Sequence, residues 1–304
     1  MKSKLLLIFL VLILSFNIFS NTNSKEKLKL AKTYLDQKNY REAEKIYLEL
    51  AKEKDIHAMY NLGYLYMEQG KIIEGEKYYK MAADMGYDDA MFNLAMFYDR
   101  QKNYDKEKLY LEKLAAKNQN DAIFQLAIIY RQEGNYQKAD EFYKRLLKEK
   151  YQESEVFYNL GVSCYYQKKY DEAEKYFLKG MEKGNVIALN NLGIVNDRKE
   201  DYNRAIEYYL MAIKKKCNFA YNNLGNLYEE IYQDYEKAEN LYRKNFKETK
   251  DTEALIHLAN LYLNRYHNKR NAIKYLELSS KKGNKEAEHI LFHLLNDEEC
   301  NCNN

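Results

Sequence analysis

The stretch that decides the fold is residues 58–86, which read AMYNLGYLYMEQGKIIEGEKYYKMAADMG. Ala58, Leu62 and Tyr66 are spaced four residues apart, so they share one face of a helix. Gly70 interrupts that pattern and indicates a turn. The first half of this stretch is therefore predicted to be an amphipathic helix that ends near Gly70.

A second helix is predicted in the other half of the stretch. Gly75, Tyr79 and Ala82 lie four and then three residues apart, which again places them on one helix face. Gly86 closes the pattern where a left-handed C-terminal cap prefers glycine. The two helices and the turn between them form a helical hairpin.

This hairpin recurs along the chain, and a leucine marks each copy. Neighbouring leucines are 32 to 34 residues apart, at Leu30, Leu62, Leu94, Leu126, Leu160, Leu192, Leu224, Leu258 and Leu291. A tyrosine follows the marker leucine by four residues at Tyr34, Tyr66, Tyr98, Tyr130, Tyr228 and Tyr262. Hairpins of this length bury their apolar faces by stacking on one another, so the pattern predicts an all-α repeat array.

The second helix of each copy has its own signature. A small residue begins its apolar stripe at Ala43, Gly75, Ala139, Ala173, Ala205, Ala238 and Ala272. An aromatic residue follows four positions later at Tyr47, Tyr79, Tyr143, Phe177, Tyr209 and Tyr242. We therefore predict a repeat domain over residues 21–297 with about eight hairpins, a C-terminal capping helix and a polar tail. The predicted boundaries are about 25–55, 57–87, 89–119, 121–152, 155–185, 187–217, 219–251 and 253–284 for the hairpins, 287–296 for the cap and 298–304 for the tail.

The recurring leucine, tyrosine, small-residue and aromatic series resembles the tetratricopeptide repeat (TPR). Residues 81–90, MAADMGYDDA, are more similar to the related Sel1-like repeat where one hairpin joins the next. The resemblance implies a right-handed α-solenoid of helix-turn-helix repeats whose first helices line a concave, protein- or peptide-binding surface. The proline of the second TPR helix and the Gly-rich insertion of Sel1 hairpins are both missing, so the choice between the two subfamilies stays open.

In the TPR family, the residue before the marker leucine often points into the concave surface. Here these residues are Asn61, Asn93, Asn159, Asn191 and Asn223, with Gln125 and His257 in the two other repeats. We call the five asparagines the amide ladder. A side-chain amide offers both a donor and an acceptor, so the ladder suits the backbone of an extended peptide. The alternative is that these amides bond to neighbouring loops or helix ends.

One residue before the ladder, four consecutive repeats carry an aromatic side chain, at Tyr60, Phe92, Phe124 and Tyr158. These side chains predict apolar pockets in the binding surface, and the alternative is that they belong to the core between repeats. Asp89, Asp121 and Glu155 are acidic at one shared position of three neighbouring repeats. This charge favours a basic segment in the bound peptide.

The sequence contains no recognisable catalytic motif. All 11 glycines fall at turns, helix ends or close-packing positions of the repeat, which leaves none for a phosphate-binding loop. Cys164 replaces the recurring tyrosine, so we expect it to be a buried small hydrophobe, whereas Cys217 lies between hairpins. Their spacing predicts no disulfide framework. We therefore predict a non-enzymatic protein without a cofactor, and a Sel1-like hydrolase or metal-dependent activity is the alternative.

One group of metal-ligating residue types lies at the C-terminus. His289 and His293 are four residues apart and share a helix face, and Cys300 and Cys302 follow. Two imidazoles and two thiolates are a suitable ligand set for zinc. The favoured interpretation is nevertheless a polar surface on the capping helix followed by a loose tail.

The N-terminus carries a separate signal. Lys2 and Lys4 precede the ten apolar residues 5–14, and a polar segment begins near residue 20. This three-part layout is typical of a secretory signal peptide, predicted here over residues 1–20. We expect export to the periplasm or the extracellular space, and an uncleaved membrane anchor is the alternative.

The charge balance bears on the partner. Across 304 residues, 49 Lys and Arg against 46 Asp and Glu give a net charge of +3. Removal of Lys2 and Lys4 with the leader would leave 47 − 46 = +1. Such a balance gives no electrostatic footprint for nucleic acid, which disfavours RNA-binding helical repeats. The expected partner is a protein or peptide, and a structural role in cell-envelope assembly stays open.

Overall fold

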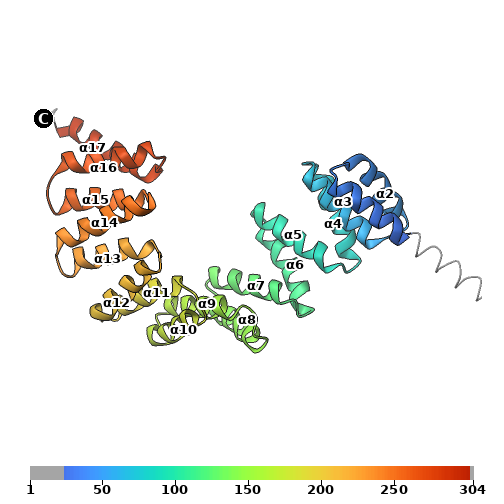
Figure 1. The fold of residues 1–304 in the computed structure, drawn as a ribbon, viewed down its shortest axis with the longest axis horizontal. Helices are drawn as coiled ribbons and strands as arrows, with labels where there is room; N and C mark the ends of the chain where they lie inside the picture. The colour runs from blue at the N-terminus through green and yellow to red at the C-terminus, as the bar shows by residue number, and fades with distance from the viewer. Residues whose placement is uncertain (1–23, 302–304) are drawn as a thin grey trace, which may run out of the picture. The chain divides into compact units, whose positions relative to one another are not determined.

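Figure 1 shows the computed structural model, which describes residues 24–301, with side chains through residue 296. Every regular element in this described part is an α-helix. The predicted signal peptide, residues 1–20, lies outside the described residues. The first helix covers residues 24–36, and it is followed by α2 (Tyr40–Lys52), α3 (Ile56–Glu68), α4 (Ile72–Asp84), α5 (Asp88–Arg100), α6 (Tyr104–Ala116), α7 (Asn120–Gln132), α8 (Tyr136–Lys148), α9 (Glu153–Tyr166), α10 (Tyr170–Glu182), α11 (Ile187–Arg198), α12 (Tyr202–Lys214), α13 (Phe219–Glu230), α14 (Tyr235–Thr249), α15 (Glu253–Asn264), α16 (Lys269–Lys281) and α17 (Lys285–Asn301).

The helices alternate as first and second helices of eight hairpins, as predicted. Hairpin 1 is residues 24–36 with α2, hairpin 2 is α3 with α4, and the series continues to hairpin 8, α15 with α16. From α2 to α6 and from α8 to α17, each helix packs on the next one along the chain, as α3, α4 and α5 show. α17 packs on α16, which confirms the capping helix.

α17 is longer than the predicted cap. It runs from Lys285 to Asn301, so the predicted polar tail is helical over its first residues. No glycine or proline lies between Lys285 and Asn301 to end the helix. Polar composition alone therefore did not mark the end of the helix.

The chain divides into two compact units, up to Leu126 and from Ala127 onward, with the boundary inside α7. We call residues 24–126 unit 1 and residues 127–301 unit 2. Unit 1 contains hairpins 1 to 3, and unit 2 contains hairpins 5 to 8 with the capping helix. The two units are described separately below.

Within a hairpin, an aromatic side chain of the second helix packs on a glycine of the first helix. A Cβ atom added to Gly63 would lie 2.4 Å from the ring of Tyr79, and one added to Gly193 would lie 2.4 Å from Tyr209. Gly161 and Gly225 face Phe177 and Tyr242 in the same way. The close-packing role predicted for these glycines is confirmed, because a side chain there would displace a buried ring.

Between hairpins, three of the tyrosines that follow a marker leucine bind a carboxylate on the preceding second helix. Their hydroxyls donate at 2.7 Å for Tyr66–Glu44, 2.6 Å for Tyr98–Glu76 and 2.8 Å for Tyr262–Glu239. At these three junctions, the recurring tyrosine contributes a charge-assisted hydrogen bond as well as apolar packing.

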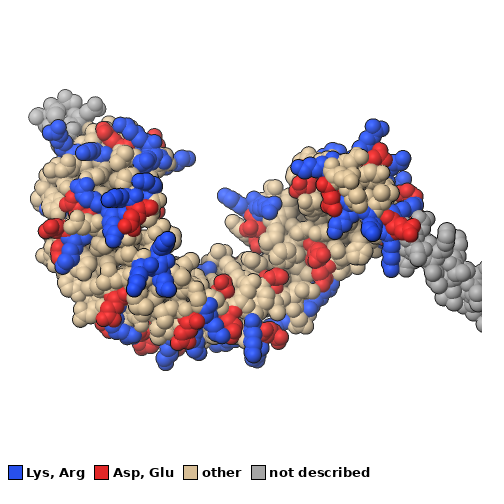
Figure 2. All heavy atoms as spheres, in the orientation of Figure 1, with Lys and Arg blue, Asp and Glu red and all other residues tan. Residues whose placement is uncertain are grey.

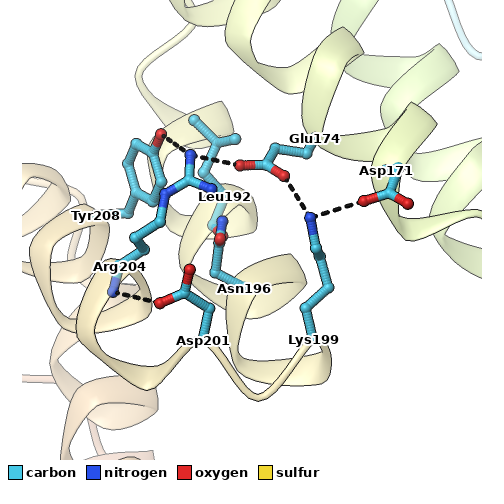
Figure 3. A network of polar contacts seen from close by, with 8 residues as sticks. All are labelled: Asp171, Glu174, Leu192, Asn196, Lys199, Asp201, Arg204 and Tyr208. Atoms are coloured by element: carbon cyan, nitrogen blue, oxygen red, sulfur yellow. Dashed lines mark hydrogen bonds and ion pairs between the residues drawn. The ribbon is translucent and has the colours of Figure 1, made fainter.

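The junction of hairpins 5 and 6 lacks this tyrosine, because Asn196 stands in its place. Asn196 is fully buried, and its Nδ2 atom donates to the carbonyl oxygen of Leu192 in the same helix at 2.8 Å. Figure 3 shows the contacts that the equivalent carboxylate, Glu174, makes there. Glu174 forms ion pairs with Lys199 at 2.8 Å and with Arg204 at 2.7 Å. Two cations therefore replace one tyrosine at this junction.

Candidate functional site

The amide ladder lies on the first helices, one residue before the buried marker leucine of each. In unit 2 the first helices of successive hairpins contact each other directly, as α11 contacts α13 and α13 contacts α15. Ladder positions of neighbouring hairpins are therefore brought next to one another. In each unit, one ladder amide bonds across to the preceding hairpin: Asn93 Nδ2 donates to Tyr60 Oη at 3.2 Å, and Asn223 Nδ2 donates to Asn190 Oδ1 at 2.8 Å.

The remaining ladder amides differ in how far they are already bonded. Asn159 is 8% exposed, and its Nδ2 donates to the carbonyl oxygen of Glu155 in its own helix at 2.8 Å. Asn61 and Asn191 are half-buried, and neither side chain makes a hydrogen bond to a described residue. The structure therefore separates the ladder into bonded amides and two amides that are open to a ligand.

Asn191 borders a cavity of about 320 Å³ in unit 2, between α9, α10 and α11. The lining is mostly aromatic and apolar: Tyr158, Val162, Tyr165, Tyr166, Phe177 and Ile194. Tyr158 packs its ring against Phe177 at 5.9 Å between centroids, while also facing the cavity. Tyr158 thus belongs both to the packing within hairpin 5 and to the cavity wall.

An arginine holds one wall of this cavity in place. Arg198 Nε donates to Tyr165 Oη at 3.3 Å, which links α11 to α9. The hydrogen bond to the tyrosine oxygen raises the pKa of Arg198. The unit 2 cavity therefore combines aromatic walls, one open amide and a cation beside Tyr165, but none of its lining residues is acidic.

Unit 1 contains a cavity that is bordered by carboxylates. Its volume is about 220 Å³, and its lining includes Tyr60, Phe92, Asn93, Gln119 and the carboxylates Asp88, Asp89 and Asp121. The carboxylate of Asp88 is paired with Lys117. The predicted site residues Tyr60, Phe92 and Asn93 therefore share one cavity, and the acidic positions Asp89 and Asp121 lie in the same cavity.

Asn93 also borders a second cavity of unit 1, of about 260 Å³, which lies at the same repeat positions as the unit 2 cavity. Tyr64, Glu68 and Tyr79 stand there where the unit 2 cavity has Val162, Tyr166 and Phe177. Phe124 is half-buried on α7. His257, at the ladder position of hairpin 8, stacks on Tyr242 with 5.1 Å between the ring centroids. Burial lowers the pKa of His257, so this ring is neutral at physiological pH.

The sequence patterns did not identify the full lining of the unit 2 cavity. Tyr165, Tyr166 and Ile194 lie outside the positions that define the repeat, and Phe177 was assigned only to the core. A signal was nevertheless present, since Tyr165 and Tyr166 form an aromatic pair beside Cys164, where the repeat tyrosine is replaced.

Neither cysteine of the hairpins has the environment of a nucleophile. Cys164 is 2% exposed, as expected, and burial together with Asp140 and Glu172 raises the pKa of its thiol to about 11. Burial also raises the pKa of Cys217. The reactive thiolate is scarce for both groups at neutral pH. Cys164 and Cys217 are both free thiols.

The structure brings the two C-terminal histidines together. His289 Nε2 and His293 Nε2 are 3.2 Å apart on the exposed face of α17. Cys300 lies about two helical turns beyond His293 along α17, and its side chain and all of Cys302 lie outside the described part. Among the side chains that the structure describes, no group of three or more His, Cys, Asp or Glu residues is placed to hold a metal ion.

Between residues 24 and 301, no helix is both long enough and apolar enough to span a bilayer.

Comparisons with known proteins agree with this architecture. The tetratricopeptide repeat model matches residues 28–86 and 60–122, and the model for "Anaphase-promoting complex, cyclosome, subunit 3" matches residues 99–180. A search of the curated proteins gave no match.

Solved structures with the same fold include a tetratricopeptide repeat protein from Parabacteroides merdae, with 18% identity, a TM-score of 0.62 and coverage of 79% of this chain and 98% of that one. A Sel1 repeat protein from Oxalobacter formigenes has 18% identity, a TM-score of 0.61 and coverage of 89% of this chain and 87% of that one. At this identity the likeness concerns the fold.

Stacked helical hairpins of 32 to 34 residues, with a capping helix, define an all-α solenoid. Residues 28–122 match the tetratricopeptide repeat model, and the fold is the one that tetratricopeptide and Sel1 repeat proteins share, as the recurring residues predicted. Repeats of this kind generally serve as scaffolds for protein–protein interaction.

Proposed function

We propose that this protein is an exported, non-catalytic scaffold that binds a protein or peptide segment along its first helices. The observation that carries the proposal is Asn191, whose half-buried amide is open and borders an aromatic cavity of about 320 Å³. An amide beside aromatic walls can bind a peptide unit while the walls take up a neighbouring side chain.

The two units offer different subsites to such a ligand. The unit 1 cavity carries carboxylates beside Tyr60 and Phe92, which suits a Lys or Arg side chain through charge and ring contacts. The unit 2 cavity has no acidic lining residue and suits an apolar or aromatic side chain. Lys and Arg side chains alternate with Asp and Glu over the visible surface in Figure 2, which favours a protein partner over nucleic acid.

Photo-crosslinking tests the proposed surface. A benzoylphenylalanine placed at residue 191 should yield adducts with a bound partner when the protein is isolated from its native envelope. The same group at Glu207, which is exposed on α12, provides the matched control. Equal adducts from both positions, or none from residue 191, would contradict the proposal.

A pair of alanine variants separates binding from folding. Asn191→Ala should weaken affinity for the crosslinked partner about two- to tenfold, because it removes one open amide, and should leave the melting temperature almost unchanged. Asn159→Ala removes a hydrogen bond within α9, so it should lower the melting temperature more than the affinity. If Asn191→Ala lowered the melting temperature and Asn159→Ala weakened the affinity, Asn191 would have a structural role.

Export is the second part of the proposal, and the leader over residues 1–20 supports it. Cleavage near Ser20 would leave a chain with a net charge of about +1, from 47 basic and 46 acidic residues. Intact-mass measurement of the native protein distinguishes a cleaved chain from one that keeps Met1 to Ser20. Retention of the leader in an envelope fraction would support the anchored form, and recovery from the cytosol would contradict export.

A further inference from the structure

A second surface of unit 2, separate from the first-helix cavity, lies at the open end of hairpin 6. It is a groove of about 570 Å³ whose lining includes Val186, Ile187, Phe219, Lys215 and Lys216, and also Asp251 and Glu253. The carboxylate of Asp251 already accepts hydrogen bonds from Asn222 and Asn245. Three apolar side chains are exposed there, Val186 by 38%, Ile187 by 47% and Phe219 by 66%. Single exposed apolar residues are ordinary, whereas several that line one groove mark an interaction site.

The other hairpins of the chain provide the comparison that makes this groove unusual. The fifth residue before each marker leucine is polar or charged in seven of nine copies: Lys25, His57, Asp89, Asp121, Glu155, Glu253 and Glu286. The two exceptions are Ile187 and Phe219, which come from consecutive hairpins and line the same groove. Two apolar replacements at equivalent, exposed positions therefore lie side by side.

A lysine of this groove lacks the ion pair that its equivalents form in two other hairpins. In hairpins 3 and 5, the lysine that ends the second helix pairs with the first residue of the first helix, as Lys117–Asp88 and Lys183–Glu153. Hairpin 6 keeps the lysine as Lys215, but its first helix begins with Ile187. Neither Lys215 nor Lys216 forms an ion pair with any residue that the structure describes.

We propose that this groove binds a partner protein segment in which a carboxylate lies next to apolar side chains. The carboxylate would take the place that Asp88 and Glu153 hold in hairpins 3 and 5, against Lys215. The apolar side chains would cover Ile187 and Phe219. The ligand would thus supply the carboxylate that hairpin 6 lacks. In hairpins 3 and 5 a carboxylate of the same hairpin already pairs with the equivalent lysine.

A displayed library of random 12-residue peptides tests this proposal with the purified full chain. The selection compares the wild type with the double variant Ile187→Glu/Phe219→Glu. Both substitutions install a residue type that other hairpins carry at this position, so the fold should persist, which a melting curve checks. Ile73→Glu is the matched control, because Ile73 is 82% exposed on α4 and lies outside the groove.

Peptides enriched on the wild type and on the Ile73→Glu control, but not on the double variant, should carry Asp or Glu beside Phe, Leu, Ile or Met. A fluorescent copy of the most enriched peptide should bind the double variant about 10- to 100-fold more weakly, because both apolar contacts are lost. Lys215→Ala should weaken binding about two- to fivefold, and this difference should shrink in high salt.

Three results would overturn the proposal. The first is a selection that enriches the same peptides on the wild type and the double variant, that enriches basic peptides, or that enriches no peptide on the wild type. The second is a wild-type dimer in sedimentation that the double variant dissociates, because the occupant would then be a second copy. The third is binding to phosphatidylglycerol vesicles that the double variant abolishes without any peptide selection, because the groove would then contact lipid.

Discussion

Hairpin 3 (α5 and α6) in unit 1 and hairpin 6 (α11 and α12) in unit 2 both carry the marker leucine and have helices of nearly equal length. They differ at other positions of the repeat. Hairpin 3 carries Glu107 where hairpin 6 carries the small residue Ala205. Hairpin 3 binds the preceding carboxylate with Tyr98, whereas hairpin 6 has Asn196 at that position.

The ends of the two hairpins differ as well. Lys117 and Asp88 close hairpin 3 by an ion pair, and the cavity beside it is acidic. Hairpin 6 exposes Ile187 and leaves Lys215 without an ion pair, and the groove at this end carries apolar Val186 and Phe219 where the cavity beside hairpin 3 has acidic residues. The comparison teaches that the leucine and its buried neighbours fix the hairpin, while the surrounding positions are free to change the chemistry of each repeat.

The largest expected effect tests whether both hairpins share the same core. Leu94 and Leu192 are each 0% exposed, so Leu94→Ala and Leu192→Ala should each lower the free energy of unfolding by about 2–5 kcal/mol. Leu291 is half-buried, because no hairpin follows the capping helix. Leu291→Ala should therefore lower the free energy of unfolding by less. Denaturant melts measure all three, and equal losses would show that position in the stack does not set burial.

The buried carboxylate of hairpin 3 should reduce stability. Glu107 is 5% exposed, and burial, with a smaller contribution from Asp99, raises its pKa from 4.5 to about 7. Glu107→Ala restores the residue type of the other hairpins, and at pH 8 it should raise the free energy of unfolding by about 1–3 kcal/mol. The reciprocal variant Ala205→Glu should destabilise hairpin 6, and a stable Ala205→Glu protein would contradict this explanation.

The pH dependence of Glu107 has a definite sign. The unfolded chain loses this proton near pH 4.5, whereas the folded chain keeps it to about pH 7. The folded state is therefore unpenalised below pH 4.5, loses stability as the pH rises from 4.5 to 7, and bears the full penalty above pH 7. The difference in melting temperature between Glu107→Ala and the wild type should grow over this range and then level off, and a constant difference would exclude the titration of Glu107 as its cause.

The smallest expected effects distinguish junctions held by a tyrosine–carboxylate hydrogen bond from the junction of hairpins 5 and 6, which is held by ion pairs. Tyr98→Phe removes the hydrogen bond to Glu76, which should lower the free energy of unfolding by about 0.5–1.5 kcal/mol with little dependence on salt. Glu174→Gln removes the ion pairs with Lys199 and Arg204, whose side chains are 28% and 45% exposed, so its smaller effect should decline in high salt. Melts at low and high salt compare the two variants, and equal salt dependence would contradict the distinction.

Most of the fold could be predicted from the sequence, because it depends on local periodicity. Leu62, Gly70 and Tyr79 establish a hairpin by spacing alone, and the structure places a turn at Gly70 with φ of 73°. The end of α17 was predicted too early, because the acidic residues from 297 onward look polar but do not terminate a helix. The close-packing role of Gly193 was predicted from the repeat pattern as well, and the structure shows that Tyr209 is the ring that packs on it.

The candidate site could be predicted only in part. The sequence indicated that Asn159 and Asn191 occupy the same ladder position, but it could not show that Asn159 bonds to Glu155 while Asn191 stays open. It also placed Tyr60 and Tyr158 either in pockets or in the core, and in the structure each contacts a core ring and lines a cavity.

By itself, the sequence determined the number of hairpins, the helix faces and the buried leucines, because each depends on residues within one turn or one repeat. The tertiary structure alone decided which amides are open, which lysines lack a carboxylate and which aromatic rings enclose a cavity. These properties depend on distances between side chains that are about 30 residues apart in the chain, such as the 33-residue separation of Asn223 and Asn190. Those distances are set by the stacking of one hairpin on the next, which repeat periodicity specifies only in outline.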